Sequence, residues 1–354
     1  MPTVFLPPLR GAQRQQIEVR SRSALEACGS TLRFDLHFPG HWRAPSGRNP
    51  CAAAMEQEVL DWFAGLGCTA AELERVQGFS VSNYVGQPFP RLSRERTLLV
   101  GKFMAMWLLW DDIQVERLQR MWSHGLPDPD SPAQMSRFDR GWGQLFADLA
   151  RRRSAGWMRA LNQGMADWCR AATREANVMR QWHGLGRLPD FSAQLELRIA
   201  TIGMYVALRL LEDACDQEFP DSFHARPAVR HLARLSNLLV GLGSDLFSLG
   251  KDLAGGQINL VLALTQGQGL SAEEAIRRLL ELHRQAIGEY DALADEAEAL
   301  PGVAAADVRR WLDDIRYATL GLTLWESQSP RCREHAVWID GRKMALDLVW
   351  RETA

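Results

Sequence analysis

Residues 103–116 read FMAMWLLWDDIQVE, an apolar run that ends abruptly in acidic residues. At about 100° per residue, a helix places Phe103, Trp107 and Asp111 on one face and Asp112 and Glu116 on a neighbouring face. Adjacent carboxylates repel one another, and either water or a bound cation relieves that repulsion. The segment therefore predicts a solvated helix end or one wall of a cation site.

A second polar stripe lies at residues 244–252, which read SDLFSLGKD. Ser244, Ser248 and Asp252 are spaced four and four, so they follow one helix face with a drift of only about 40° per step. Two hydroxyls and a carboxylate are oxygen ligands of the kind that suit Mg²⁺. A polar helix face or a helix–helix hydrogen bond would give the same stripe. Two such segments in one chain favour the metal interpretation.

The remainder of the chain after residue 50 has helical periodicity. Apolar residues recur at threes and fours from Ala52 to Gly65 and in runs at about 93–124, 135–151, 155–184, 190–215, 226–265, 271–299 and 303–326. Short Pro, Gly and Asp breaks separate the runs, and no alternating strand pattern interrupts them. Ser271-Ala-Glu-Glu is a capping box that starts one of the helices. We expect an all-α, single-domain helical bundle.

The first fifty residues differ from the rest. They are rich in Pro, Gly and Arg and show no clear period. We therefore divide the chain into an N-terminal arm at 1–50, which we expect to add nothing to the core, and a helical domain at 51–354. No repeat of 33–45 residues is visible, which argues against a helical solenoid.

Composition excludes several classes of partner. The chain has 354 residues, of which 46% are hydrophobic and 24% charged, and 41 Lys+Arg against 43 Asp+Glu give a net charge of −2. This balance provides no positive field for nucleic acid or an anionic membrane. The apolar run at 104–110 is far shorter than the ~18 residues that a membrane span needs. Six cysteines without metal-ligand spacing are expected to be free thiols, which indicates a cytoplasmic location.

The two acidic segments resemble the metal motifs of the class I terpene cyclases of bacteria. The first motif of that family is DDxxD or DDxxxE, and here it is Asp111-Asp112-Ile-Gln-Val-Glu116. The second is (N/D)D(L/I/V)x(S/T)xxx(E/D), and here it runs from Ser244 to Asp252, with Lys251 just before the final acid.

Two further features extend the resemblance to about residues 30–335. The family carries a diphosphate-sensing arginine about 46 residues before the second motif, and Arg198 stands there, followed by Thr201-Ile202-Gly203. The family also has a tryptophan followed six residues later by an Arg-Tyr pair. Here Trp325 is followed by Arg331-Cys332.

The chain departs from the family pattern at four positions. Ser244 replaces the usual Asn or Asp, Asp252 replaces the commoner Glu, Val115 replaces the last Asp of the commoner first motif, and Cys332 replaces the tyrosine. A serine hydroxyl is a weaker ligand than an amide oxygen, and aspartate reaches less far than glutamate. We expect these changes to affect the metal and diphosphate contacts more than the fold.

The resemblance implies magnesium-dependent ionisation and cyclisation of a linear prenyl diphosphate, with farnesyl diphosphate the expected substrate and about three Mg²⁺ ions. The implied metal ligands are Asp111, Asp112, Glu116, Ser244, Ser248 and Asp252. The implied diphosphate-binding and ionising groups are Arg198, Lys251, Arg331 and a carbonyl of Thr201 or Ile202. The implied substrate pocket contains Phe103, Trp107, Phe247 and Trp325.

Other readings stay open at this level. A diterpene or monoterpene synthase acting on geranylgeranyl or geranyl diphosphate would share every motif, whereas a chain-elongating prenyl diphosphate synthase would normally carry two DDxxD motifs. A non-catalytic helical interaction protein belongs to another class altogether. The sequence is compatible with a homodimer but does not determine the oligomeric state. If Arg198 senses diphosphate, we expect non-helical backbone at 201–203 beside the pocket, with Arg198 close to both metal motifs.

Overall fold

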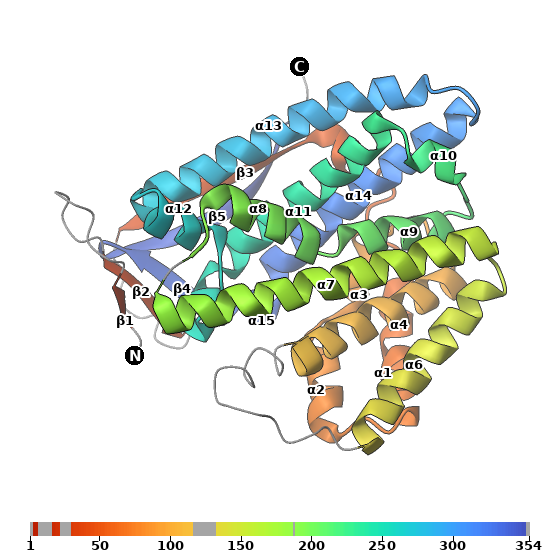
Figure 1. Ribbon diagram of the computed structural model, residues 1–354, viewed down its shortest axis with the longest axis horizontal. Coiled ribbons are helices and arrows are strands. Elements are labelled where there is room, and N and C mark those ends of the chain that lie inside the picture. The colour runs from red at the N-terminus through yellow and green to blue at the C-terminus, as the bar shows by residue number, and fades with distance from the viewer. Residues whose placement is uncertain (1–2, 6–15, 22–29, 116–131, 187, 352–354) are drawn as a thin grey trace.

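A computed structural model describes residues 3–5, 16–21, 30–115, 132–186 and 188–351 (Figure 1). The chain is mostly helical, as the periodicity predicts. The helices are η2 (Gly40–Trp42), α1 (Ala52–Gly65), α2 (Ala70–Gly78), α3 (Val81–Gly86), α4 (Arg94–Trp110), η3 (Asp111–Val115), α6 (Pro132–Ala150), α7 (Ala155–Leu185), α8 (Phe191–Thr201), α9 (Met204–Ala214), α10 (Asp221–His224), α11 (Pro227–Gly255), α12 (Leu260–Gly267), α13 (Ala272–Glu298), α14 (Ala305–Gln328) and α15 (Pro330–Arg333).

Helix α11 forms the centre of the bundle. Every residue from Leu235 to Leu246 is buried, and the helix packs against α8, α9, α13, α14 and α15. Figure 1 shows α11 between α13 on one side and α7 on the other. A helix that is buried on all sides has no solvent face, so the polar side chains at 244–252 must find partners or ligands inside the protein.

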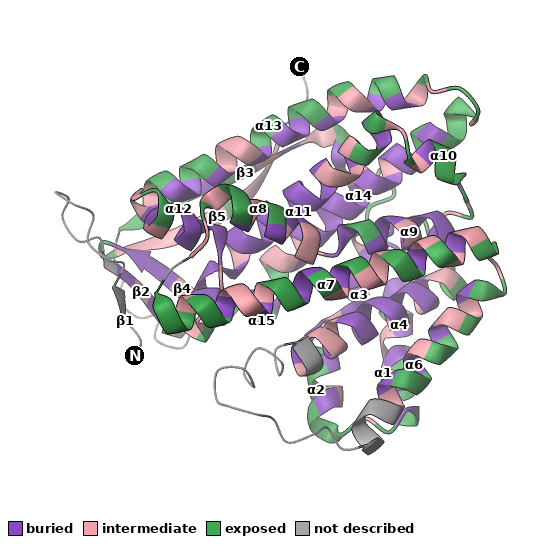
Figure 2. Ribbon diagram, viewed as in Figure 1, coloured by how far each residue is buried: buried purple, intermediate pink, exposed green. Residues whose placement is uncertain are grey.

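The outer helices are amphipathic. The buried residues of α13 include Ala275, Ile276, Leu279, Ala286 and Ile287. Their positions repeat with the helical period, which places them on one face toward the core. Figure 2 shows α13 and α7 with alternating buried and exposed faces, whereas the inner helices are largely buried. Helix α4 is also buried over most of its length, because α1, α3 and α6 cover it.

The two ends of the chain join in a five-stranded sheet. Its strands are β1 (Thr3–Phe5), β2 (Gln16–Ser21), β3 (Thr31–Pro39), β4 (His335–Ile339) and β5 (Arg342–Arg351), in the order β1-β2-β4-β5-β3. Strand β3 runs parallel to β5, with Thr31 opposite Lys343 and Pro39 opposite Arg351. One face of the sheet packs on α11 and α13.

The expectation that residues 1–50 add nothing to the core is therefore wrong. Leu32, Phe34, Leu36 and Phe38 of β3 are buried at alternate positions, a period-2 pattern that the sequence itself contains. An Asp340-Gly341 turn with positive φ at both residues joins β4 to β5, which is the strongest short hairpin signal. No local signal marks the pairing of β3, because its partner β5 lies 312 residues further along the chain. The division of the chain into units 1–50 and 51–354 stays a prediction.

Two predicted helical runs are each divided in two. The run at 190–215 separates into α8 and α9, where the sequence predicts a break. The run at 226–265 separates into α11 and α12 because Gly256 takes a left-handed φ of 64° and ends the first helix. In the part of the chain that the structure describes, no helix combines the length and apolarity needed to cross a membrane.

Candidate active site

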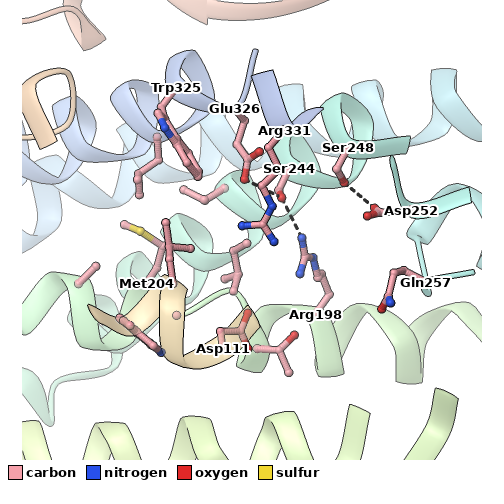
Figure 3. A pocket seen from close by; sticks show the side chains of 18 of the residues that line it. Asp111, Arg198, Met204, Ser244, Ser248, Asp252, Gln257, Trp325, Glu326 and Arg331 are labelled. Carbon is pink, nitrogen blue, oxygen red and sulfur yellow. Dashed lines mark hydrogen bonds between the residues drawn. The ribbon is translucent and has the colours of Figure 1, made fainter. Parts of the chain in front are cut away.

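A pocket of about 220 Å³ lies between α4, α8, α9, α11, α14 and α15 (Figure 3). Of the residues implied by the resemblance, those that line it are Trp107, Asp111, Arg198, Thr201, Ile202, Ser244, Ser248, Lys251, Asp252, Trp325 and Arg331. These residues come from segments up to about 220 positions apart in the chain. The fold therefore brings both acidic segments, the candidate sensor and the C-terminal arginine to one cavity.

The first acidic segment forms one side of the pocket. Asp111 lines the cavity, while the neighbouring Asp112 is buried and accepts a hydrogen bond from Arg331 Nη2 at 2.9 Å. The backbone from Asp111 to Val115 is a turn of π-helix, a distortion that is frequent at functional sites. Glu116 lies outside the described residues.

The stripe on α11 forms the opposite side. Ser244, Ser248 and Asp252 are all buried and all line the pocket. Ser248 Oγ donates to Asp252 Oδ2 at 2.5 Å, and Asn259 Nδ2 donates to the same oxygen at 2.9 Å. Lys251 Nζ lies 2.7 Å from the other carboxylate oxygen. This predicted row of oxygens is therefore present and aligned along one helix face.

Arg198 links α8 to α11. Its Nη2 donates to Ser244 Oγ at 2.9 Å, and its Nε lies 2.7 Å from Asp245 Oδ1. Burial opposes the charged form of Arg198, but the carboxylates of Asp245 and Glu175 outweigh this effect and raise the pKa of the guanidinium. Arg198 therefore stays a cation and points to the pocket rather than to solvent.

The helix break behind Arg198 is present as predicted. Helix α8 ends at Thr201, and α9 begins at Met204 after Gly203, which has a φ of 88°. Trp168 Nε1 donates to the freed Thr201 carbonyl at 2.8 Å, and Thr201 Oγ1 bonds Glu175 Oε1 at 3.0 Å. Among the described residues, no donor contacts the carbonyl of Ile202, which also lines the pocket. The break thus leaves the backbone oxygen of a pocket-lining residue without a described hydrogen-bond donor.

Gly203→Ala should damage both stability and activity. The left-handed φ strains any other L-residue, at a cost of about 1–3 kcal/mol. The new Cβ would also lie 2.8 Å from Trp107 Cη2, so the indole must shift within the pocket. We expect a lower melting temperature and a turnover reduced more than tenfold, measured by thermal denaturation and by diphosphate release.

Gly302→Ala is the matched control, because Gly302 has a φ of 89° and nothing within 4 Å of the added Cβ. This variant should lose stability through strain alone and keep its turnover. Equal activity in the two variants would indicate that the Trp107 position is unimportant.

The far end of the pocket is aromatic. Trp107 and Trp168 meet edge to face with their ring centroids 5.2 Å apart, and Tyr84 and Trp325 lie 4.2 Å apart. Trp325 is held in place because its Nε1 donates to the Phe79 carbonyl at 2.8 Å. Methionine and leucine side chains complete this end of the cavity. The pocket thus has a polar end with oxygens and guanidinium groups and an apolar end with ring faces.

Two aromatic residues named from the sequence lie elsewhere. Phe103 is fully buried against Trp142 and Phe146 of α6, with ring centroids 5.1 and 6.2 Å away, and does not line the pocket. Phe247 does not line it either, since three residues of helix turn it about 60° away from Ser244. Helical spacing indicates a shared face but not which neighbour covers it.

The pocket-lining residues that sequence reasoning missed include Tyr84, Trp168, Glu175 and Glu326. The first three lie outside any motif, so no local signal marks them. Glu326 directly follows Trp325, and its position next to a motif residue was the available signal. The folded structure identifies them because they lie close together in space, although no regular sequence spacing relates them.

Comparison with known proteins agrees with this geometry. The family model of terpene synthase family 2, C-terminal metal binding, matches residues 102–289. Bonnadiene synthase of Allokutzneria albata is 27% identical over 292 residues, covering 76% of this chain and 79% of that protein. Spiroviolene synthase of Streptomyces violens is 26% identical over 310 residues, covering 81% and 82%. The structure of linalool/nerolidol synthase from Streptomyces clavuligerus with 2-fluorogeranyl diphosphate superposes with a TM-score of 0.66 at 23% identity, covering 81% of this chain and 97% of that chain.

The fold and the two-sided pocket define a helical bundle of the class I terpene synthase type. The family match spans more than half of the chain. The chain therefore belongs to terpene synthase family 2, whose C-terminal domain binds metal, and it is an enzyme of the lyase class.

Proposed function

We propose that the protein ionises a linear prenyl diphosphate, with farnesyl diphosphate as its main substrate, and cyclises the resulting cation to a terpene hydrocarbon or alcohol. The observation that carries this proposal is the pocket's polarity. Asp111, Ser244, Ser248 and Asp252 gather near Arg198 and Arg331 (Figure 3). Trp107, Trp168 and Trp325 also line the pocket.

The donor set suits magnesium held together with diphosphate. The described residues contain no group of three or more His, Cys, Asp or Glu side chains able to hold a metal by themselves. Mg²⁺ is commonly bound by one or two carboxylates plus substrate phosphates, and hydroxyl oxygens can complete the shell. We propose that Asp111, Asp112 and Glu116 bind metal from one wall of the pocket and that Ser244, Ser248 and Asp252 bind it from the other, for about three ions.

Three basic side chains, those of Arg198, Lys251 and Arg331, would bind the diphosphate oxygens. In the structure each is paired with an acid: Arg198 with Asp245, Lys251 with Asp252, and Arg331 with Asp112. These pairs keep the cations charged and ordered in the pocket before the substrate arrives. Arginine can then donate two parallel hydrogen bonds to the leaving group as the C–O bond breaks. Bound magnesium supplies Lewis-acid polarisation of the diphosphate oxygens.

The apolar end would protect the cation after ionisation. Ring faces carry negative potential and attract a positive charge, and a cavity lined by indoles excludes water. The Ile202 carbonyl, left without a described donor, would direct a further partial negative charge at the developing cation. Thr201 is less suited to this role because Trp168 already binds its carbonyl.

Chain length is tested by incubating the enzyme with Mg²⁺ and geranyl, farnesyl or geranylgeranyl diphosphate, followed by gas chromatography–mass spectrometry. The cavity of about 220 Å³ is small for a ligand site, which disfavours the C20 chain of geranylgeranyl diphosphate. We expect a cyclic C15 product from farnesyl diphosphate. A C20 product alone would replace farnesyl by geranylgeranyl diphosphate. In a parallel incubation that also contains isopentenyl diphosphate, formation of a longer linear diphosphate would indicate a chain-elongating enzyme.

A non-catalytic role has a separate test. Magnesium with inorganic diphosphate should raise the melting temperature of a protein that binds both. The absence of any shift and of any product would favour a helical interaction protein. A cytoplasmic location and a homodimer stay predictions.

A further inference from the structure

Glu326 lies on α14 at the polar end of the pocket, outside both metal motifs. Ser244 Oγ donates to its Oε1 at 3.1 Å, and the Cys332 thiol donates to its Oε2 at 2.8 Å. Figure 3 shows the Glu326 carboxylate directed toward Ser244 and Arg331. Its side chain is half-buried, so it is neither a surface acid nor a core residue.

These two contacts coincide with two of the positions at which the chain departs from the family pattern. Ser244 stands where an asparagine or aspartate is usual, and Cys332 stands where a tyrosine is usual. Both replacements are shorter side chains, and one carboxylate reaches both of them. Glu326 therefore adds an anionic oxygen at the place where the second motif has lost an amide or carboxylate oxygen.

The charges in the pocket give this oxygen a chemical task. Asp252 already accepts from Ser248 and Asn259 and lies against Lys251. Glu326, in contrast, makes no ion pair with any residue that the structure describes. A carboxylate beside a bound diphosphate repels it unless a cation lies between them. The Glu326 carboxylate raises the pKa of Arg198 and Arg331, but these arginines are paired with Asp245 and Asp112. The position of Glu326 therefore favours a further cation at its oxygens when diphosphate is bound.

We propose that Glu326 is a metal ligand that compensates for Ser244, so that the hydroxyl and the carboxylate together replace the single amide or carboxylate of the usual motif. This inference rests on the proposed function, because it assumes that a divalent cation and diphosphate occupy the pocket. It adds α14 to the elements that bind the metal.

The test measures Mn²⁺ binding by electron paramagnetic resonance in the presence of inorganic diphosphate, since Mn²⁺ accepts the same oxygen ligands as Mg²⁺. Glu326→Gln should weaken Mn²⁺ binding about tenfold. Ser244→Asn should restore it to within about twofold of the wild type in the Glu326→Gln protein, yet change it little in the wild type. If the effects of Glu326→Gln and Ser244→Asn on Mn²⁺ binding are non-additive in this way, the side chains at positions 326 and 244 supply the same metal-ligand position.

Glu334→Gln is the matched control, because Glu334 is exposed and lies eight residues further along the chain. It should bind Mn²⁺ like the wild type. Melting temperatures without metal verify that each variant is folded. Wild-type binding in Glu326→Gln, or failure of Ser244→Asn to restore binding, would overturn the inference. Failure of the wild type itself to bind Mn²⁺ with diphosphate would overturn the proposed function instead.

Discussion

Asp111→Asn should lower turnover of farnesyl diphosphate by about a hundredfold or more, a loss comparable to removing one group that stabilises charge in a transition state. Asp111 lines the pocket, and asparagine keeps the shape of the side chain while removing its charge. The variant should therefore fold normally, with an unchanged helical circular dichroism spectrum. Measuring diphosphate release against Mg²⁺ concentration tests the assignment, since the variant should also need more Mg²⁺.

The matched control is Asp139→Asn, an exposed aspartate on α6. It carries the same chemical change at a site remote from the pocket and should leave turnover within about twofold. An Asp111→Asn enzyme with wild-type turnover would show that Asp111 is only the acidic end of a helix.

Arg198→Lys should reduce kcat/KM by about a hundredfold even though it keeps the charge. The planar guanidinium spans Ser244 Oγ and Asp245 Oδ1 at once, and one ammonium cannot copy that fork. Because diphosphate is common to all substrates, the loss should be the same for geranyl, farnesyl and geranylgeranyl diphosphates. Steady-state kinetics with the three substrates measures this ratio.

Lysine at position 198 also leaves the buried Asp245 less well paired, so a fall in melting temperature is expected as well. The constant ratio across chain lengths separates the diphosphate role from a general loss of structure. Arg234→Lys provides the control, because Arg234 forms an exposed pair with Glu196 that contributes little. A loss that grows with chain length would contradict the sensor role and would instead indicate that Arg198 shapes the hydrocarbon pocket.

Much of the site could be predicted from short-range spacing. Ser244, Ser248 and Asp252 share a helix face because a helix turns by about 100° per residue, and this holds wherever the helix lies. The same geometry placed Asp111 beside Trp107 in the pocket. The break at Gly203 also has a local cause, since glycine adopts a φ of 88° at little cost.

Other features depend on which surfaces meet. Phe103 and Trp107 are one helix turn apart, yet α6 covers the first and the cavity receives the second. Asp112 turns toward Arg331, which is 219 residues later in the chain. Such pairings follow from packing between helices, and no local spacing encodes them.

Bond geometry within a few residues specifies the helices that carry the site, the two rows of oxygen ligands and the helix break, so the sequence alone predicts them. The pairing of β3 with β5, the contact of Arg331 with Asp112 and the position of Glu326 beside Ser244 depend on the folded chain. These contacts join residues 82 to 312 positions apart. Their partners are selected by burial of apolar surface and by compensation of charge over the whole chain, which become defined only when the chain has folded.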